Sequence, residues 1–219
     1  CTSPRRMNTM KTKLCLLILL IVGLSVQLSA NPINGLLERI DKGASKKFVI
    51  EFKKGADDFF ELDQKGTKVV VRGNNYVNIA TGINWYLKYY AGIQLSWNGM
   101  QAKLPQVLPP VSRKERHETS LSLRYDFNYC TYSYTMAFWD WERWEKEIDW
   151  MALHGINLPL AAVGQECIWF NMLQKLGYSK DEINRFIAGP AFLAWWAMNN
   201  LEGWGGPNPV SYTHLTLPT

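Results

Sequence analysis

Cysteine and histidine are scarce in this sequence, with four cysteines and three histidines among 219 residues. Cys1 and Cys15 lie within the first thirty residues, which leaves only Cys130 and Cys167 for the rest of the chain. Two cysteines can form one disulfide but not the several disulfides that stabilise a small disulfide-rich fold, so a protein of that class is excluded. No set of cysteines and histidines has the spacing of a zinc site, and the sequence indicates neither a metal nor a cofactor.

A basic surface is also missing. The net charge of +5 arises almost entirely in residues 1–30, where four cations stand without an acidic residue: Arg5, Arg6, Lys11 and Lys13. The rest of the chain therefore carries a net charge of only +1. Because no basic stripe remains to displace counterions from phosphates, we expect no nucleic-acid partner.

The apolar run 14–24 is much shorter than the roughly 20 residues that cross a bilayer. Lysines precede this run and the small residues Ser29 and Ala30 follow it, an order typical of a secretory signal peptide. We therefore predict a signal peptide at residues 1–30, with Met10 as the start of translation. The protein is expected to be exported, secreted or periplasmic, and to have no stable membrane span.

The first folded segment has the pattern of a small α+β domain, which we place at residues 31–104. Apolar residues at helical spacing predict helices at 32–41 and 75–90, the second of which ends at Gly92. Runs of β-branched and aromatic residues predict strands, which lie at 48–52, 68–71 and 93–97.

Prolines and charges follow this domain. Pro105, Pro109 and Pro110, with the charged run 113–118 behind them, interrupt both periodicities. We therefore expect a linker at 105–118 whose charged side chains lie in solvent.

Strand and helix alternate after the linker. A strand at 121–125 is expected to deliver polar residues at its carboxyl end: Asp126, Asn128 and Cys130. The nearly continuous apolar run 156–163 predicts a parallel strand buried on both faces, although Pro159 fits poorly in a central strand. Helices are expected between and after these strands, at 141–153 with Asp140 as N-cap and Gly155 as stop, at 167–176 and at 180–187. This order predicts an α/β fold with a parallel sheet or a (β/α)8 barrel.

Eight of the ten tryptophans lie between residues 124 and 204, among asparagine, aspartate and glutamate. A core built only for burial would favour leucine, isoleucine and valine, whereas aromatic rings beside amides and carboxylates suit the apolar faces and hydroxyls of a sugar. Within this stretch Trp144, Ile148 and Trp150 share a helix, and we expect them to pack against the fold rather than touch a ligand. We interpret the stretch as part of a carbohydrate site.

Three motifs in this half carry a resemblance: RYDFNYCTYSY at 124–134, WDWERWEKEIDWMALHGIN at 139–157 and GPAFLAW at 189–195. These long segments of uncommon residues resemble the α-N-acetylglucosaminidase family, glycoside hydrolase family 89. The preceding small domain is similar to the N-terminal domain of that family. The resemblance implies a small α+β domain followed by an incomplete (β/α)8 TIM barrel, in a retaining enzyme that releases terminal α-linked N-acetylglucosamine from a glycan.

The resemblance also implies site residues. Asn128, Cys130 and Trp195 fall on family positions that line the pocket for the terminal sugar. Tyr134 and Glu166 match motif residues for which a sugar contact stays open, and Glu166 can equally be structural. From the residues alone, Cys130 can instead be a small buried side chain or half of a disulfide with Cys167, and Asp126 can orient Arg124 or a neighbouring backbone amide.

The catalytic pair has no counterpart in this sequence. Retaining glycosidases need two carboxyl groups about 5 Å apart, and the family takes both from later barrel strands. A complete barrel takes about 250 residues, whereas the segment 119–210 suffices for about two strand–helix units. We therefore expect a fragment that is inactive alone, with residues 211–219 as a non-native tail. A non-catalytic carbohydrate-binding module is the alternative function.

Overall fold

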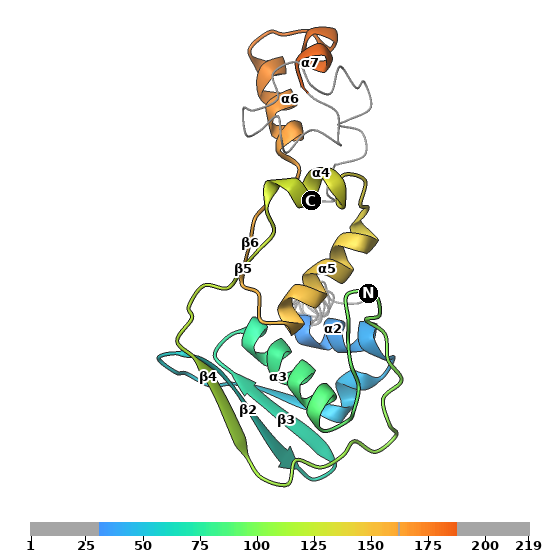
Figure 1. The fold of residues 1–219 in the computed structure, drawn as a ribbon, viewed down its shortest axis with the longest axis vertical. Helices are drawn as coiled ribbons and strands as arrows, with labels where there is room; N and C mark the ends of the chain where they lie inside the picture. Colours follow the sequence, from blue (N-terminus) through green and yellow to red (C-terminus); the bar gives the residue numbers. More distant parts are fainter. Residues whose placement is uncertain (1–30, 162, 188–219) are drawn as a thin grey trace, which may run out of the picture.

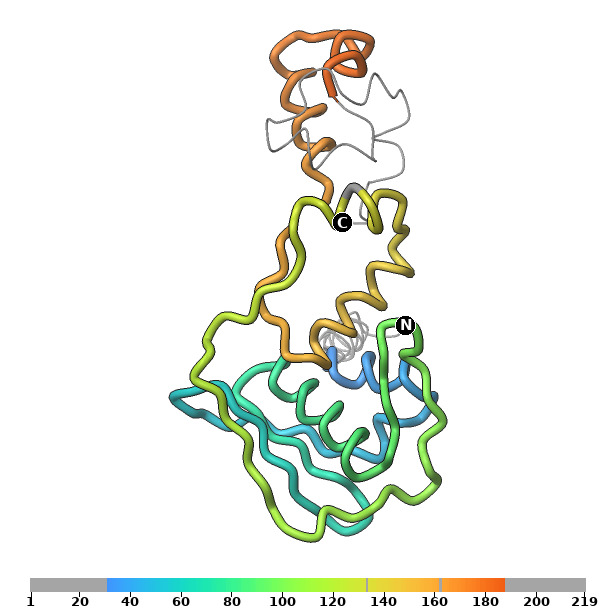
Figure 2. The backbone as a smooth tube through the Cα atoms, in the orientation of Figure 1, coloured from blue at the N-terminus to red at the C-terminus, as the bar shows by residue number. Residues whose placement is uncertain are grey.

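The computed structural model of the chain describes residues 31–161 and 163–187 (Figures 1 and 2). A sheet covered by helices forms one end of the molecule, helices α6 and α7 form the other, and α5 and two short strands lie between them (Figure 1). Across these ranges, no helix combines the length and the apolar character that a bilayer crossing requires.

The N-terminal sheet has the strand order β1-β3-β2-β4. β1 (Phe48–Phe52) pairs in parallel with β3 (Lys68–Gly73), and β3 pairs antiparallel with β2 (Asp58–Lys65). β4 (Glu115–Thr119) adds to the other side of β2, also antiparallel. The predicted strands at 48–52 and 68–71 are confirmed, whereas β2 and β4 had not been predicted.

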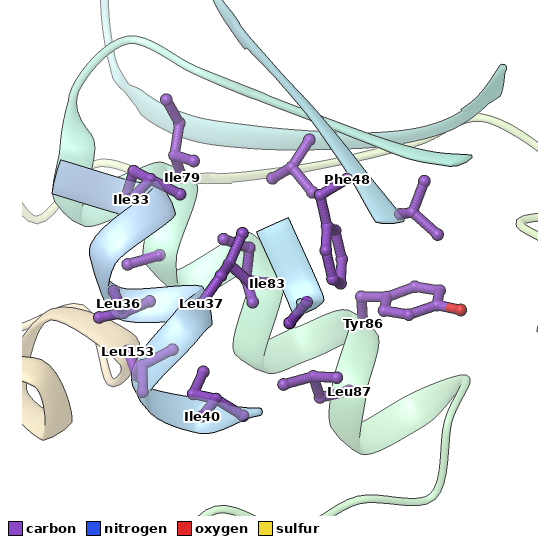
Figure 3. Close-up of a cluster of buried hydrophobic side chains, with 14 of the residues drawn as sticks. Ile33, Leu36, Leu37, Ile40, Phe48, Ile79, Ile83, Tyr86, Leu87 and Leu153 are labelled. Atoms are coloured by element: carbon purple, nitrogen blue, oxygen red, sulfur yellow. The ribbon is translucent and has the colours of Figure 1, made fainter. Parts of the chain in front are cut away.

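Two helices and a 3-10 turn, η1 (Ala44–Lys47), complete this layer. Asparagine side chains start both helices: Asn31 Oδ1 accepts a hydrogen bond from Ile33 N at the start of α2 (Pro32–Ile40), and Asn75 Oδ1 accepts one from Asn78 N at the start of α3 (Tyr76–Tyr89). Their apolar faces meet the sheet in one core (Figure 3), whose members include Ile33, Leu36, Leu37, Ile79, Ile83 and Leu87. Both predicted helices are confirmed.

Helix α5 (Trp141–Leu153) begins at the predicted N-cap, where Asp140 Oδ1 accepts from Arg143 N. Its last residue, Leu153, is 0% exposed and belongs to the core of the N-terminal layer (Figure 3). Asn84 on α3 donates to the Leu153 carbonyl at 3.1 Å. The helix after the expected linker is thus docked on the layer before that linker.

The expected linker at 105–118 ends in a strand, β4, although four of the six residues in the charged run 113–118 are exposed as expected. β4 is an edge strand, and Leu108 and Val111 ahead of it are buried in the N-terminal core. The strand is held by the buried Glu61 of β2, whose carboxylate lies 3.0 Å from Arg116 Nη1 and 3.1 Å from Lys114 Nζ. Burial raises the pKa of Glu61, but hydrogen bonds from Lys53, Arg116 and Lys114 outweigh it and lower the pKa to about 2.

The predicted strand at 93–97 is also wrong. Ser96 and Gly99 form only an isolated bridge, and the segment is otherwise irregular. Leu95 is nevertheless fully buried. The apolar residues that suggested a strand therefore serve to close the core with a loop.

The second half contains the expected pair of parallel strands, but both are short. β5 (Tyr125–Asp126) pairs with β6 (Leu158–Pro159). The predicted burial of 156–163 on both faces is wrong, because the described residues supply only two strands to this sheet and Leu158 is 42% exposed. Pro159 is accommodated because it lies at the end of the ladder.

Three further helices accompany these strands. α4 (Tyr129–Tyr134) follows β5, and α6 (Gln165–Lys175) and α7 (Lys180–Phe186) follow β6. The helices predicted at 167–176 and 180–187 are confirmed within two residues. Because β5 and β6 are parallel, the segments that follow them leave from the same edge of the sheet.

Candidate functional site

Asn128 lies just beyond the carboxyl end of β5 and caps helix α4. Its Oδ1 accepts from Thr131 N at 3.1 Å, and Thr131 Oγ1 accepts from Asn128 N at 3.3 Å, so the two residues form a capping box. The residue is exposed. Because the cap engages the oxygen, the Nδ2 group is the donor that Asn128 can offer to a ligand.

Phe127 turns the chain sharply from β5 into α4. Its φ of 74° makes it the one non-glycine residue in the left-handed region among the described residues. This conformation costs about 1–2 kcal/mol for an L-residue, and such strain is often found at functional sites. Asp126 Oδ1 stabilises the turn by accepting from Phe127 N at 2.7 Å, so of the two roles considered for Asp126 the structure selects the neighbouring backbone amide.

Cys130 and Tyr134 both lie on α4 and are exposed. Cys130 and Cys167 are free thiols. The structure thus supports neither a disulfide between them nor a buried Cys130. Cys130 is accessible at the edge where the strands end, and its place in a sugar pocket stays a prediction.

Glu166 lies in the first turn of α6, after β6. The residue is 1% exposed, and no other residue in the described part of the chain forms a hydrogen bond with either carboxylate oxygen. Burial raises the pKa of Glu166 to about 6. Because both oxygens are shielded, neither can reach a sugar in this conformation, and the structural role of Glu166 is the one that the geometry favours.

An aromatic cluster joins the residues that follow the two strands. Tyr132, Met136 and Trp144 are buried, and residues from both strand ends pack against them: Phe127, Tyr129, Trp139, Leu160 and Val163. The expected packing role of Trp144 is confirmed. Trp150 stacks on His154 with 4.4 Å between the ring centroids, whereas Ile148 is 46% exposed.

Trp195, the third predicted pocket residue, lies outside the described residues, as do the expected signal peptide and tail. Two surface hollows of the described part lie away from the carboxyl ends of β5 and β6. One of about 420 Å³ is lined by α2 and residues 101–103, and one of about 280 Å³ lies between α2 and α5. Most of their charged groups are engaged with protein atoms, for example Arg39 with Asp149 and Asp41 with Leu104 N, so we assign no ligand to them.

An α+β layer followed by parallel strand–helix units, with polar residues where the strands end, defines the class as a two-part α/β protein. A sequence model of the α-N-acetylglucosaminidase N-terminal domain matches residues 31–110, and a model of the TIM-barrel domain of the same enzymes matches residues 124–217. The chain belongs to the α-N-acetylglucosaminidase family, glycoside hydrolase family 89.

The relatives agree with this assignment. The α-N-acetylglucosaminidase of Homo sapiens is 44% identical over 172 residues, which are 78% of this chain and 23% of that protein. A family 89 glycoside hydrolase from Clostridium perfringens in complex with PUGNAc has a TM-score of 0.78 and 40% identity, covering 84% of this chain and 21% of that one. A variant from the same organism, with two glutamates replaced by glutamine and in complex with its substrate GlcNAc-α-1,4-galactose, has a TM-score of 0.78 and 39% identity over 84% of this chain and 22% of that one. The chain spans less than a quarter of the length of these relatives.

The matches confirm the resemblance, and the second half matches part of the TIM-barrel domain of the family. That it forms an incomplete barrel stays a prediction. The N-terminal match runs past the expected boundary at 104, to residue 110. The barrel match runs to residue 217 and so includes most of 211–219. That those residues are a non-native tail stays a prediction.

Proposed function

We propose that the chain is the N-terminal part of an exported, retaining glycoside hydrolase that releases terminal α-linked N-acetylglucosamine from glycans. One observation carries this proposal: the two halves of the chain match two domain models of one family, in order, and the second match includes the motif with Asn128 and Cys130. The Clostridium perfringens relative acts on GlcNAc-α-1,4-galactose, which supports a sugar of this class.

In this proposal the chain supplies walls of the sugar pocket. Asn128 Nδ2 donates to an oxygen of the terminal sugar, and Cys130 lies on the same edge. Trp195 packs its indole on a pyranose face. Glu166 is buried in the first turn of α6 and does not touch the sugar.

The acid/base and the nucleophile are expected outside this chain. A retaining mechanism places these two carboxyl groups about 5 Å apart across the scissile bond. Because the chain spans less than a quarter of the length of its relatives, we expect the 219 residues alone to give no turnover.

Export rests on residues 1–30, where lysines precede a short apolar run and small residues follow it. Expression of the gene in a secreting host and sequencing of the released protein's N-terminus test this part. A mature terminus near residue 31 is the expected result, and a protein that retains residues 11–30 inside the cell contradicts it.

The activity is tested with the full-length protein on 4-nitrophenyl α-N-acetylglucosaminide. We expect release of nitrophenol from this α-glycoside and none from the matched 4-nitrophenyl β-N-acetylglucosaminide. A full-length protein that binds N-acetylglucosamine without cleaving the α-glycoside would overturn the proposal in favour of a carbohydrate-binding module.

A further inference from the structure

Arg124 stands at the start of β5 and holds four parts of the molecule together. Its Nη2 lies 2.8 Å from Asp58 Oδ2 on β2 and 3.3 Å from Asn78 Oδ1 on α3. Its Nη1 donates to the Leu121 carbonyl at 2.6 Å, and its Nε donates to the carbonyl of Gly155, in the turn between α5 and β6. One guanidinium thus links the N-terminal sheet, its helix α3, the segment that precedes β5 and the turn that precedes β6.

The ion pair at the centre of this arrangement is shielded from water. The side chains of Arg124 and Asp58 are only 16% and 17% exposed. Asn75 Nδ2 donates to Asp58 Oδ1 at 3.1 Å and fixes the carboxylate. Burial alone would raise the pKa of Asp58, but hydrogen bonds from Arg124 and Asn78 outweigh it, and the pKa lies below its usual value. Asp58 is therefore charged at neutral pH and keeps the guanidinium in place.

The backbone of Arg124 sets the register of the two strands. Its N donates to Asn157 Oδ1 at 2.8 Å, and its carbonyl accepts from Asn157 N at 3.1 Å and from Leu158 N at 3.2 Å. Asn128 follows only four residues later, through the two residues of β5 and the strained turn at Phe127. Because this segment is short and constrained, a shift of Arg124 is expected to move Asn128 as well.

We propose that the Asp58–Arg124 ion pair is a positioning device, by which the N-terminal domain sets the place of Asn128 and Cys130 at the sugar-binding edge of the barrel. The link to sugar binding rests on the proposed function. Neither Asp58 nor Arg124 touches the sugar, and both act through β5. The N-terminal domain then contributes to substrate binding without supplying a ligand to the substrate.

A second ion pair between the same two regions provides a matched control. Arg39 on α2 binds Asp149 on α5 through two hydrogen bonds, of 2.6 and 2.7 Å. This pair also joins the N-terminal layer to the second half, but it engages the middle of α5 and not β5. Its loss is expected to weaken docking without moving Asn128.

The test uses the full-length protein with Asp58→Asn, Arg124→Lys, the double variant and the control Arg39→Gln. A misplacement of about 1 Å can cost about 100-fold in rate, so for Asp58→Asn and Arg124→Lys we expect kcat/KM on the nitrophenyl α-glycoside to fall by about 10- to 100-fold per folded molecule, mainly through KM. Because the two residues act as one unit, the double variant should lose little more than either single variant. Arg39→Gln should stay within about twofold of the wild type.

Alkylation of Cys130 by iodoacetamide, relative to that of Cys167 and followed by peptide mass spectrometry, tests positioning without any reference to activity. We expect the Cys130:Cys167 rate ratio to change severalfold in Asp58→Asn and Arg124→Lys and to stay unchanged in Arg39→Gln. An unchanged ratio in the first two variants overturns the positioning device. If the wild-type protein shows no turnover, the proposed function is wrong. The Cys130:Cys167 alkylation ratio still decides whether the ion pair positions Cys130.

Discussion

The two halves of the described chain differ in how much of their own packing they supply. The N-terminal layer and α5 enclose one core of 20 buried residues, of which only Leu153 comes from beyond residue 111. The second half has two clusters of three buried residues each. It also leaves large apolar side chains exposed, including Leu121, Leu123, Tyr125, Phe138 and Ile168. The first half supplies all of its core except Leu153, whereas a parallel strand pair needs cover on both faces.

The comparison also shows where the halves are joined. Helix α5 follows the expected linker in sequence, yet its end is part of the N-terminal core and its start is part of the aromatic cluster around Trp144. Helix α5 therefore connects the core of the N-terminal layer to the segments that follow β5 and β6.

The largest effect is expected at Leu153, the residue that carries the second half into the core of the first. Leu153→Ala should lower the free energy of unfolding by about 3 kcal/mol, because it removes a fully buried side chain and leaves a cavity. Ile148→Ala on the same helix, at a 46% exposed site, should cost less than about 1 kcal/mol. Urea denaturation of the full-length protein measures the free energy of unfolding of both variants. Equal losses in the two variants would contradict the claim that α5 is anchored in the N-terminal core.

A smaller and pH-dependent effect is expected at Glu166, the buried acid of the second half. Its pKa is raised from 4.5 to about 6, so the folded protein loses stability as the pH rises through 6. Glu166→Gln removes this ionisation and should stabilise the protein by about 2 kcal/mol at pH 8 and by nothing at pH 4.

The exposed Glu142 on α5 supplies the control for that measurement. Glu142→Gln breaks only the surface pair with Lys146 and should change stability by less than about 0.5 kcal/mol at either pH. Unfolding curves at pH 4, 6 and 8 give the comparison. A Glu166→Gln variant that is less stable than the wild type at pH 8 would mean that the ionised carboxylate has a partner in solution.

The smallest effect on stability is expected at Asn128, where capping and ligand binding can be separated. Asn128→Ala removes the cap of α4 and should reduce the protection of α4 amides by about 1 kcal/mol, whereas Asn128→Ser keeps a cap oxygen and should cost only a few tenths. Hydrogen exchange measures this difference. Both variants should lose sugar affinity equally, since both lack Nδ2. Full affinity in Asn128→Ser would show that Asn128 does not contact the sugar.

Helices were predictable from the sequence because their signals are local. Asp140 starts α5 as the predicted N-cap, and apolar residues at helical spacing define the buried faces of α3 and α5. The strands that were missed depend on partners far along the chain. β2 carries Glu61 and Asp63 beside apolar residues, and β4 is a run of charges that forms a strand by pairing with β2, where Arg116 meets Glu61, 55 residues away.

The candidate site was predictable in part for the same reason. The positions of Asn128 and Cys130 after β5 follow from the order of strand and helix. The left-handed turn at Phe127 could not be predicted, because an aromatic residue is not typical of that conformation. The contact between Asp58 and Arg124 could not be predicted either, because it joins two halves that the sequence indicated as separate domains. The burial of Glu166 depends on packing around α6, which the order of elements does not specify.

The anomer that the full-length protein first releases from an α-linked N-acetylglucosaminide tests the central claim most directly. Proton NMR at early times distinguishes it before mutarotation. A retaining enzyme of this family should release the α anomer first, at a rate that Asp58→Asn lowers and Arg39→Gln does not. Release of the β anomer first, or no release at all, would contradict the account.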